Sequence, residues 1–303
     1  MMKKCLVLLA TYNGERYLRE QIDSILKQEG VEVEIAASDD CSTDGTQEIL
    51  KEYSEKYPNF SFYVNKENKK FTYNFLDLFF SVKDKKFDYV AFADQDDFWM
   101  PNKLIEGIKK IEEVGETKNG CLYSSNLIVA NENLEKIGMQ EDETVLTKTN
   151  KQTYLFENIA TGCTMVMDKK FYDHAVKYYP NNVNLHDYWL FMIAQYTANY
   201  VYDFNGYILY RQHGDNQIGT NKKKWTRKNI SKVLHSKNGQ DHTADELIKG
   251  FEKDIYPENL QDLIMIRDYK KKFKYKWKLM FNKKYRKRNR NLILKLKFIL
   301  NKV

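Results

Sequence analysis

Hydrophobic positions in the N-terminal third of the chain alternate between short continuous runs and helically spaced stripes. The continuous runs predict buried strands at 3–10, 31–37, 60–64 and 88–93. Between and after them, apolar residues recur every three or four positions, which predicts helices at 15–27, 46–57, 71–82 and 101–111. Strand and helix therefore alternate four times, as is typical of a mostly parallel sheet flanked by helices. We predict an α/β fold of this kind.

The pattern is less regular after residue 120. Apolar runs predict further strands at 120–130, 159–167 and 201–210. The polar stretch between the first two of these is predicted to be a loop or hairpin, and a helix is predicted to open near residue 184. Basic amphipathic helices follow from residue 222, with a capping box at Thr243–Glu246.

Charge separates the end of the chain from the rest. The whole chain carries a net charge of +7, whereas residues 267–303 contain 16 Lys or Arg and one acidic residue, Asp268. The remainder is therefore net acidic. We predict a main domain at 1–219 and a basic helical C-terminal region at 220–303, and such asymmetry indicates an anionic surface as partner.

The basic residues of 270–303 are interleaved with aromatic and aliphatic ones. This pattern favours a helix that lies in the interface of an anionic membrane. A solvated basic helix, packed on the body or in a homodimer contact, is the alternative. Charge alone would also suit a nucleic acid, but no nucleic-acid-binding motif accompanies it, so we predict no nucleic-acid partner.

The sequence also bears on the compartment. The four cysteines lie far apart, which favours a reducing environment over a disulfide framework. The apolar run that follows Met1–Lys4 is six residues long, too short for a secretory signal, and no stretch reaches the roughly 18 apolar residues of a membrane span. We predict a cytoplasmic protein, peripheral at the inner face of the cell membrane.

Three carboxylates within four residues follow the buried strand at 88–93. Asp94, Asp96 and Asp97 stand at its carboxyl end, where parallel sheets place their ligands. A hard divalent cation held against a diphosphate would relieve their mutual repulsion. An acidic surface turn is the alternative, and the apolar Phe98 and Trp99 directly afterwards argue against it.

Polar clusters stand at the ends of other predicted elements. These are Thr11–Gly14, Asp39–Asp40, His186–Asp187 and Arg211–His213. A cation site with a further carboxylate on a separate element suits metal-assisted group transfer, because that carboxylate can take a proton from an attacking hydroxyl. Asp39 or Asp40 could accept a hydrogen bond from a nucleobase. Helix N-caps for the aspartates, and structural roles for the histidines, are the alternatives.

Read together, these motifs resemble glycosyltransferase family 2, the inverting enzymes of the GT-A fold. The family's successive motifs are matched by Ala10–Gly14, Ser38–Thr46, Asp94–Asp97 and His186–Trp189. They occur in order between about Lys3 and Gly219. The resemblance implies a GT-A sheet flanked by helices, with a nucleotide-sugar half at 1–100 and an acceptor half at 101–219.

The resemblance also implies a role for each matched residue. Donor contacts are implied for Thr11, Tyr12, Asn13, Glu15, Asp39, Asp40, Asp94, Gln95 and Arg211. Asp96 and His213 would hold Mn²⁺ or Mg²⁺, and Asp187 would be the general base of a single in-line displacement. The implied acceptor-side positions are Trp99, Gly162, His186 and Trp189.

Two stretches, Tyr210–Gly219 and the residues DQDDFW at 94–99, look most like the rhamnosyltransferases of this family. That likeness implies dTDP-L-rhamnose as the donor and a lipid-linked saccharide or growing bacterial surface polysaccharide as the acceptor. A UDP-hexose donor on the same fold is one alternative. A non-catalytic scaffold that binds sugar nucleotides or polysaccharide at the membrane is another. Hydrolysis is disfavoured, because a glycosidase needs two carboxylates that flank one bond.

Overall fold

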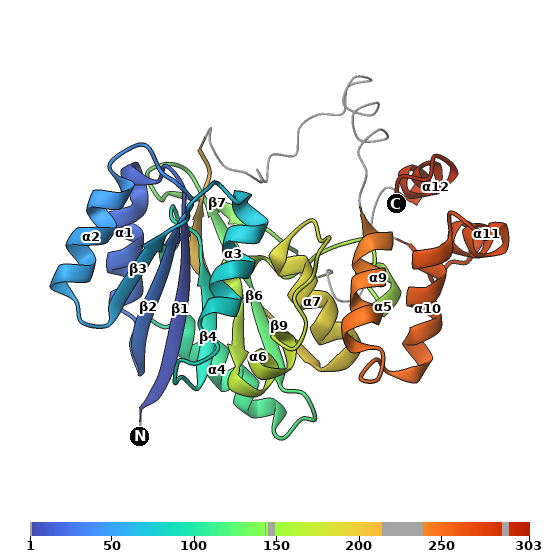
Figure 1. Cartoon of the computed structure of the whole chain (residues 1–303), viewed down its shortest axis with the longest axis horizontal. Helices are drawn as coiled ribbons and strands as arrows, with labels where there is room; N and C mark the ends of the chain where they lie inside the picture. Colours follow the sequence, from blue (N-terminus) through green and yellow to red (C-terminus); the bar gives the residue numbers. More distant parts are fainter. Residues whose placement is uncertain (1, 143, 145–148, 214–238, 287–290) are drawn as a thin grey trace. The chain divides into compact units, whose positions relative to one another are not determined.

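The computed structural model describes residues 2–142, 144, 149–213, 239–286 and 291–303 (Figure 1). The chain divides into two compact units whose segments interleave along the sequence. The first unit comprises Met1–Glu141, Ala160–Lys177 and Ala198–Thr220, and the second comprises Asp142–Ile159, Tyr178–Thr197 and Asn221–Val303. The predicted boundary between residues 219 and 220 lies outside the described residues.

Nine strands form one sheet within the described part of the first unit. They are β1 (Lys3–Thr11), β2 (Val31–Asp39), β3 (Phe60–Val64), β4 (Tyr89–Ala93), β5 (Phe98–Trp99), β6 (Cys121–Ala130), β7 (Lys136–Met139), β8 (Val166–Asp168) and β9 (Asn199–Arg211). Their order is β3-β2-β1-β4-β8-β6-β9-β5, and β7 pairs with β6 outside this path. Both predicted halves, 1–100 and 101–219, thus contribute strands to the same sheet.

The four strands β3, β2, β1 and β4 are parallel, and Thr11 at the end of β1 is in register with Asp39 at the end of β2. Beyond them, β8 runs antiparallel to both β4 and β6, and β9 runs parallel to β6. Parallel strands bring their carboxyl ends to one edge, so the loops after β1, β2 and β4 meet there. The predicted α/β class is confirmed.

Helices cover both faces of this sheet (Figure 1). In the first unit these are α1 (Glu15–Leu26), α2 (Thr46–Lys56), α3 (Lys70–Ser81), α4 (Lys103–Val114) and α6 (Lys169–Ala175). Apolar residues of α1, α2 and α4 pack against the face of β1 that carries Cys5, Val7 and Leu9. On the other face, Phe75 of α3 meets Phe92 of β4 with ring centroids 5.3 Å apart. This two-sided burial explains why the strands read as continuous apolar runs.

The second unit is helical in its described part. Its helices are α5 (Lys151–Tyr154), α7 (His186–Thr197), α9 (Gln240–Phe251), α10 (Pro257–Asp268), α11 (Phe273–Phe281) and α12 (Asn291–Ile299). Every residue of α7 is buried, and its Trp189 ring packs against Tyr178 and Phe251 at centroid distances of 6.4 and 6.0 Å. None of the helices that the structure describes is both long enough and apolar enough to cross a bilayer.

Two predicted elements are wrong. The strand predicted at 159–167 is interrupted by a 3₁₀ turn at Gly162–Thr164, because the Thr164 N–H and hydroxyl both donate to the Thr161 carbonyl, at 3.0 and 2.7 Å. Only Val166–Asp168 joins the sheet there. The capping box predicted at Thr243–Glu246 lies inside α9, which begins at Gln240. The Thr243 hydroxyl instead donates to the carbonyl four residues earlier, at 3.2 Å.

Candidate active site

The loop after β2 is organised by the buried carboxylate of Asp39. This carboxylate accepts four hydrogen bonds, from the Thr11 hydroxyl at 2.9 Å, the Ser42 N–H at 2.9 Å, the Ser42 hydroxyl at 2.5 Å and the Gln47 amide at 3.1 Å. These donors compensate the loss of hydration that burial imposes on a charged group. Asp39 therefore fastens the loop after β2 to the end of β1.

Asp40 is also buried, but its two carboxylate oxygens differ in their hydrogen bonds. Its Oδ1 accepts hydrogen bonds from the Asn65 side-chain amide at 2.9 Å and from the Lys69 N–H at 2.8 Å. No described residue donates to its Oδ2. Because α2 begins at Thr46, the alternative that Asp39 or Asp40 is its N-cap is wrong. The Oδ2 atom of Asp40 is left to accept a hydrogen bond from a ligand.

Asn13 and Glu15 link the loop after β1 to the loop after β2. The Asn13 side-chain oxygen accepts a hydrogen bond from the Thr43 N–H at 2.8 Å, and a Glu15 carboxylate oxygen accepts one from the Gly45 N–H at 2.9 Å. Asn13 also has a positive φ of 48°, a conformation that asparagine tolerates better than most residues. In this conformation the two side chains hold the two loops together. Their implied contacts with the donor stay predictions.

Gln95 fixes the backbone of Tyr12. Its amide oxygen accepts a hydrogen bond from the Tyr12 N–H at 2.7 Å, and its amide nitrogen donates to the Tyr12 carbonyl at 3.0 Å. Gly14 makes room for this pair, since a Cβ atom there would lie 2.3 Å from the Gln95 side-chain oxygen. The Tyr12 ring itself is 45% exposed. A fixed backbone with an exposed ring is suited to stacking on a flat ligand.

The acidic cluster after β4 contains both paired and unpaired carboxylates. An Asp96 oxygen lies 2.7 Å from Nε2 of His213. Asp97 is fully buried, and its oxygens accept no hydrogen bond of normal geometry from the described residues, although the Cys163 thiol and the Arg211 N–H lie close enough to favour its charged form. Asp94, Asp97 and Cys163 each offer a ligand atom, and these atoms lie within 4.8 Å of one another.

This cluster shifts the protonation of its neighbours. Burial, followed by repulsion from Asp96 and Asp94, raises the pKa of Asp97 well above its usual range. Burial, and after it the charges of Asp97 and Asp94, also raise the pKa of Tyr210. Oxygen and imidazole donors around an excess of negative charge form a set that fits a divalent cation.

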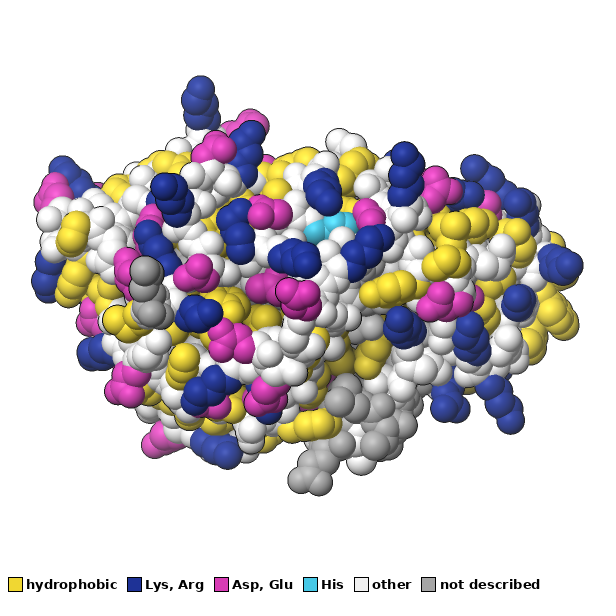
Figure 2. All heavy atoms as spheres, turned by 90° about the horizontal axis from the view of Figure 1, so that it is seen from below, with side chains coloured by type: hydrophobic (Ala, Val, Ile, Leu, Met, Phe, Trp, Pro, Cys, Tyr) yellow, Lys and Arg dark blue, Asp and Glu magenta, His cyan; other side chains and the backbone are white. Residues whose placement is uncertain are grey.

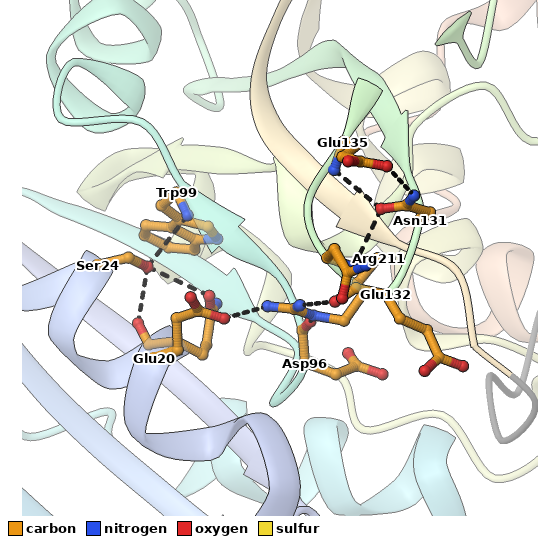
Figure 3. Close-up of polar contacts among 10 residues, drawn as sticks. Glu20, Ser24, Asp96, Trp99, Asn131, Glu132, Glu135 and Arg211 are labelled. Carbon is orange, nitrogen blue, oxygen red and sulfur yellow. Dashed lines mark hydrogen bonds and ion pairs between the residues drawn. The ribbon is translucent and has the colours of Figure 1, made fainter. Parts of the chain in front are cut away.

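Arg211, at the end of β9, contacts Asp96 in the turn Asp94–Asp97 and two glutamates from other segments (Figure 3). It donates to the Asp96 carbonyl at 2.9 Å and to the Glu132 carbonyl, and it forms an ion pair with Glu20. Its guanidinium group also lies 4.4 Å from the centre of the Tyr17 ring. The side chain is buried, so in this conformation it positions the Asp96 backbone, and its implied contact with the donor stays a prediction.

Asp187 lies in the first turn of α7, in the second unit. Its carboxylate accepts a hydrogen bond from the Tyr188 N–H at 2.5 Å. The Trp189 N–H donates to the Leu185 carbonyl at 3.1 Å, so the helix has already begun at Asp187 and the N-cap alternative is wrong. Burial lowers the pKa of the neighbouring His186 to about 3, which keeps its imidazole neutral near pH 7.

The implied acceptor-side residues are all buried. Trp99 lies in the core of the first unit, where the Lys103 ammonium stands 3.6 Å above its ring. Burial lowers the pKa of Lys103 to about 7. Trp189 and His186 are buried in the second unit, and Gly162 is buried in its 3₁₀ turn. In this conformation neither tryptophan ring is exposed to an acceptor, and these four assignments stay predictions.

Sequence reasoning missed several partners of the site. Asn65 directly follows β3 and reaches Asp40, so its place after a strand that ends at the same edge was a usable signal. Glu20 and Glu132 hold Arg211 from α1 and from the turn after β6, positions that carry no motif. Only the folded structure brings these two residues together.

Comparisons with known proteins indicate the family of the chain. A family model described as glycosyl transferase family 2 matches residues 6–174. The chain is similar to the dTDP-rhamnosyl transferase RfbG of Shigella flexneri, with 33% identity over 269 residues that cover 80% of this chain and 89% of that protein.

Solved structures show the fold. TarS 1–349 of S. aureus, in complex with UDP-GlcNAc, gives a TM-score of 0.58 at 17% identity and covers 92% of this chain and 76% of its own. The mannosyltransferase PcManGT from Pyrobaculum calidifontis, in complex with GDP-Man and Mn²⁺, gives a TM-score of 0.57 at 13% identity, with coverage of 99% and 86%.

Proposed function

The chain belongs to glycosyl transferase family 2 and is a glycosyltransferase of the GT-A fold, and we propose that the sugar it transfers is L-rhamnose. The donor would be dTDP-L-rhamnose, and the acceptor a hydroxyl of a growing, lipid-linked bacterial surface polysaccharide. The observation that carries this proposal is the similarity, over most of both chains, to a protein named as a dTDP-rhamnosyl transferase.

The nucleobase would bind at the ends of β1 and β2. Thymine and uracil each have a ring N–H that can donate a hydrogen bond to Oδ2 of Asp40. The exposed Tyr12 ring can stack on either base. Both bases fit this description, so the UDP-hexose alternative is decided by experiment. A thermal-shift panel of dTDP, UDP and GDP sugars, with and without Mn²⁺, should give its largest shift with dTDP-L-rhamnose and metal. A larger shift with a UDP-hexose would overturn the rhamnose assignment.

We propose Mn²⁺ or Mg²⁺ as the cofactor. Asp96 and His213 would hold the cation, because their donor atoms converge to 2.7 Å and Arg211 fixes the Asp96 backbone. When bound, the cation would neutralise charge that develops on the leaving nucleoside diphosphate. Asp94 would contact the donor from the same turn, and Gln95 keeps that turn attached to Tyr12.

Asp187 is the proposed general base. It would take the proton from the acceptor hydroxyl as the acceptor oxygen bonds to the anomeric carbon. As this bond forms, the bond from that carbon to the diphosphate breaks on the opposite side, and its electron pair leaves with the nucleoside diphosphate, so one inversion results. Asp187→Asn should lower transfer about 10³-fold or more while dTDP affinity stays within about twofold. Transfer at the wild-type rate by this variant would remove Asp187 from the mechanism.

The acceptor would be reached at the cytoplasmic face of the membrane, with the basic region 270–303 close to the lipid. A homodimer contact through the same region is the competing proposal. The non-catalytic scaffold predicts nucleotide binding without any product. A transfer assay with labelled donor and membrane-derived acceptor therefore decides between an enzyme and a scaffold.

A further inference from the structure

Helix α11 turns three aromatic rings outward. Phe273, Trp277 and Phe281 are spaced four residues apart and therefore lie on one face, with exposed fractions of 74%, 56% and 52%. Their ring centroids follow one another at 6.0 and 4.4 Å. The opposite side of the helix is anchored by Leu279, which is buried. Large rings are normally the most buried side chains, so a contiguous exposed row of them marks an interaction surface.

Helix α12, which packs against α11, also exposes aliphatic side chains. Leu292 and Ile299 are 71% and 53% exposed and lie two helical turns apart. The two helices are tied together, since the Lys276 ammonium donates to the Ile299 carbonyl at 3.0 Å. The Lys295 ammonium of α12 also lies 5.4 Å from the centre of the Phe281 ring. We call Phe273, Trp277, Phe281, Leu292 and Ile299 the docking face.

Basic side chains surround the docking face. Exposed lysines on α11, α12 and the turn between them include Lys274, Lys278, Lys283 and Lys295. The sequence holds no acidic residue between 269 and 303. Figure 2 shows hydrophobic and basic side chains gathered at the end of the second unit, on the right of that view. An apolar centre with a basic rim is complementary to a layer that is apolar inside and anionic at its surface.

We infer that the docking face binds the surface of an anionic lipid bilayer, with its rings at the boundary between headgroups and acyl chains. Lysine stems can lie along the apolar layer while their ammonium groups reach the lipid phosphates. A second copy of this chain fits less well, because a symmetric contact would bring two basic rims together. This inference extends the membrane-borne acceptor of the proposed function, but it does not depend on the donor.

The test uses the full chain and vesicles of phosphatidylglycerol and phosphatidylcholine. Phe273→Gln/Trp277→Gln/Phe281→Gln keeps good helix formers on α11, and it should lower vesicle binding about tenfold or more in co-sedimentation. The matched control replaces exposed apolar residues of the first unit, Ile137→Gln/Phe204→Gln, and should bind vesicles as the wild type does. Vesicles of phosphatidylcholine alone should bind weakly.

A second measurement locates the rings. Binding to vesicles should blue-shift part of the tryptophan fluorescence, and lipids brominated in the acyl chain should quench that part. Trp277→Phe should abolish both changes. Absence of such quenching, or equal binding by the triple variant, would overturn the inference. If the wild type forms dimers in a concentration-dependent way and the triple variant does not, the inference is also overturned, and the docking face is a self-association surface. Nucleotide affinity of the triple variant should stay unchanged, so a failed lipid test and a failed donor assignment remain distinguishable.

Discussion

The ends of β2 and β4 carry the same residue type in opposite states. Asp39, at the end of β2, and Asp97, just beyond β4, are both fully buried. Asp39 accepts four hydrogen bonds of good geometry, whereas Asp97 accepts none of normal geometry from the residues that the structure describes and is approached only by the Cys163 thiol and the Arg211 N–H. Burial is equal, so the difference lies in the donors that surround each carboxylate.

That difference separates a carboxylate that stabilises its own loop from one that is suited to bind a cation or ligand. A buried carboxylate with hydroxyl, amide and backbone donors stabilises the loop that supplies them. One that lacks such a set of donors and stands beside other carboxylates is electrostatically unfavourable until a cation or ligand compensates it. We call the loop that Asp39 organises after β2 the satisfied side of the edge, and the turn that contains Asp97 after β4 the unsatisfied side. Chemistry is expected on the unsatisfied side.

The largest effect should come from Asp96→Asn on the unsatisfied side. The variant removes charge from the proposed cation site, so transfer should fall about 10³-fold or more, and metal-dependent nucleotide binding should be lost. Radiolabel transfer and calorimetry with Mn²⁺ and dTDP measure the two effects. Glu52→Gln, an exposed carboxylate of α2 paired with Arg19 at 2.7 Å, is the control and should behave as the wild type does. Normal metal-dependent binding by Asp96→Asn would show that the cation binds elsewhere.

The comparison itself is tested by a matched pair, Asp39→Asn and Asp97→Asn. The first leaves several buried donors without an acceptor and should lower the free energy of unfolding by about 2–4 kcal/mol. The second replaces a buried carboxyl group whose pKa is already raised and leaves no set of donors without an acceptor, so it should change the free energy of unfolding by less than about 1 kcal/mol, or raise it. Urea denaturation in the absence of metal provides both values. Equal losses in the two variants would mean that hydrogen bonding does not distinguish these carboxylates.

How far the sequence predicted this site depends on the range of each contact. The strands that end at Thr11, Asp39 and Ala93 were predicted because buried parallel strands have a local apolar signature. The state of each carboxylate was not, since it depends on contacts such as Thr11 to Asp39 and Asn65 to Asp40 that join distant segments. The identity of the residue at one position does not reveal these long-range contacts.

The second half was less predictable for a related reason. Gly162–Thr164 reads as apolar strand, but hydroxyl-to-carbonyl bonding around Thr161 makes it a turn. Helix α7 is buried on every side, so it shows no amphipathic stripe that would reveal which neighbours it packs against. Arg211 is predicted to contact an anionic ligand, and in this conformation it pairs with Glu20 of α1, a contact that no local pattern indicates.

His186 extends the comparison to a buried group that avoids the cost of burial by staying neutral. Its pKa in the folded protein is lowered to about 3, against 6.5 for an ordinary histidine. The unfolded chain therefore takes up the proton first, and stability is lost as the pH falls from 6.5 toward 3, at up to about 1.4 kcal/mol per pH unit. Above pH 6.5 both states are neutral and this contribution does not vary.

His186→Gln should flatten that dependence. Urea unfolding of each protein is measured at one pH above 6.5 and at another pH one unit below 6.5. The two values give, for the variant and for the wild type, the slope of the free energy of unfolding against pH. The difference in slope is the readout, because the substitution itself can lower stability equally at every pH. Identical slopes would mean that His186 is protonated in the folded protein or is not buried.

The smallest expected effect comes from weakening the hydrogen bonds by which Gln95, after β4, holds Tyr12, after β1. Gly14→Ala places a Cβ atom 2.3 Å from the Gln95 side-chain oxygen, so the flexible glutamine must move and give up its two bonds to Tyr12. Gly14 has a φ of −105°, which alanine can adopt, so the fold should lose no more than about 1 kcal/mol. If Tyr12 stacks on the base, loosening its backbone should weaken dTDP binding about three- to tenfold.

Gly138→Ala is the matched control, because a Cβ atom at that position would meet nothing within 4 Å. It should leave both stability and dTDP affinity unchanged, as measured by calorimetry on the two variants side by side. Unchanged affinity in Gly14→Ala, with Tyr12 released from Gln95, would mean that this connection keeps the edge intact without shaping the nucleotide site. The satisfied and unsatisfied sides would then act independently in binding.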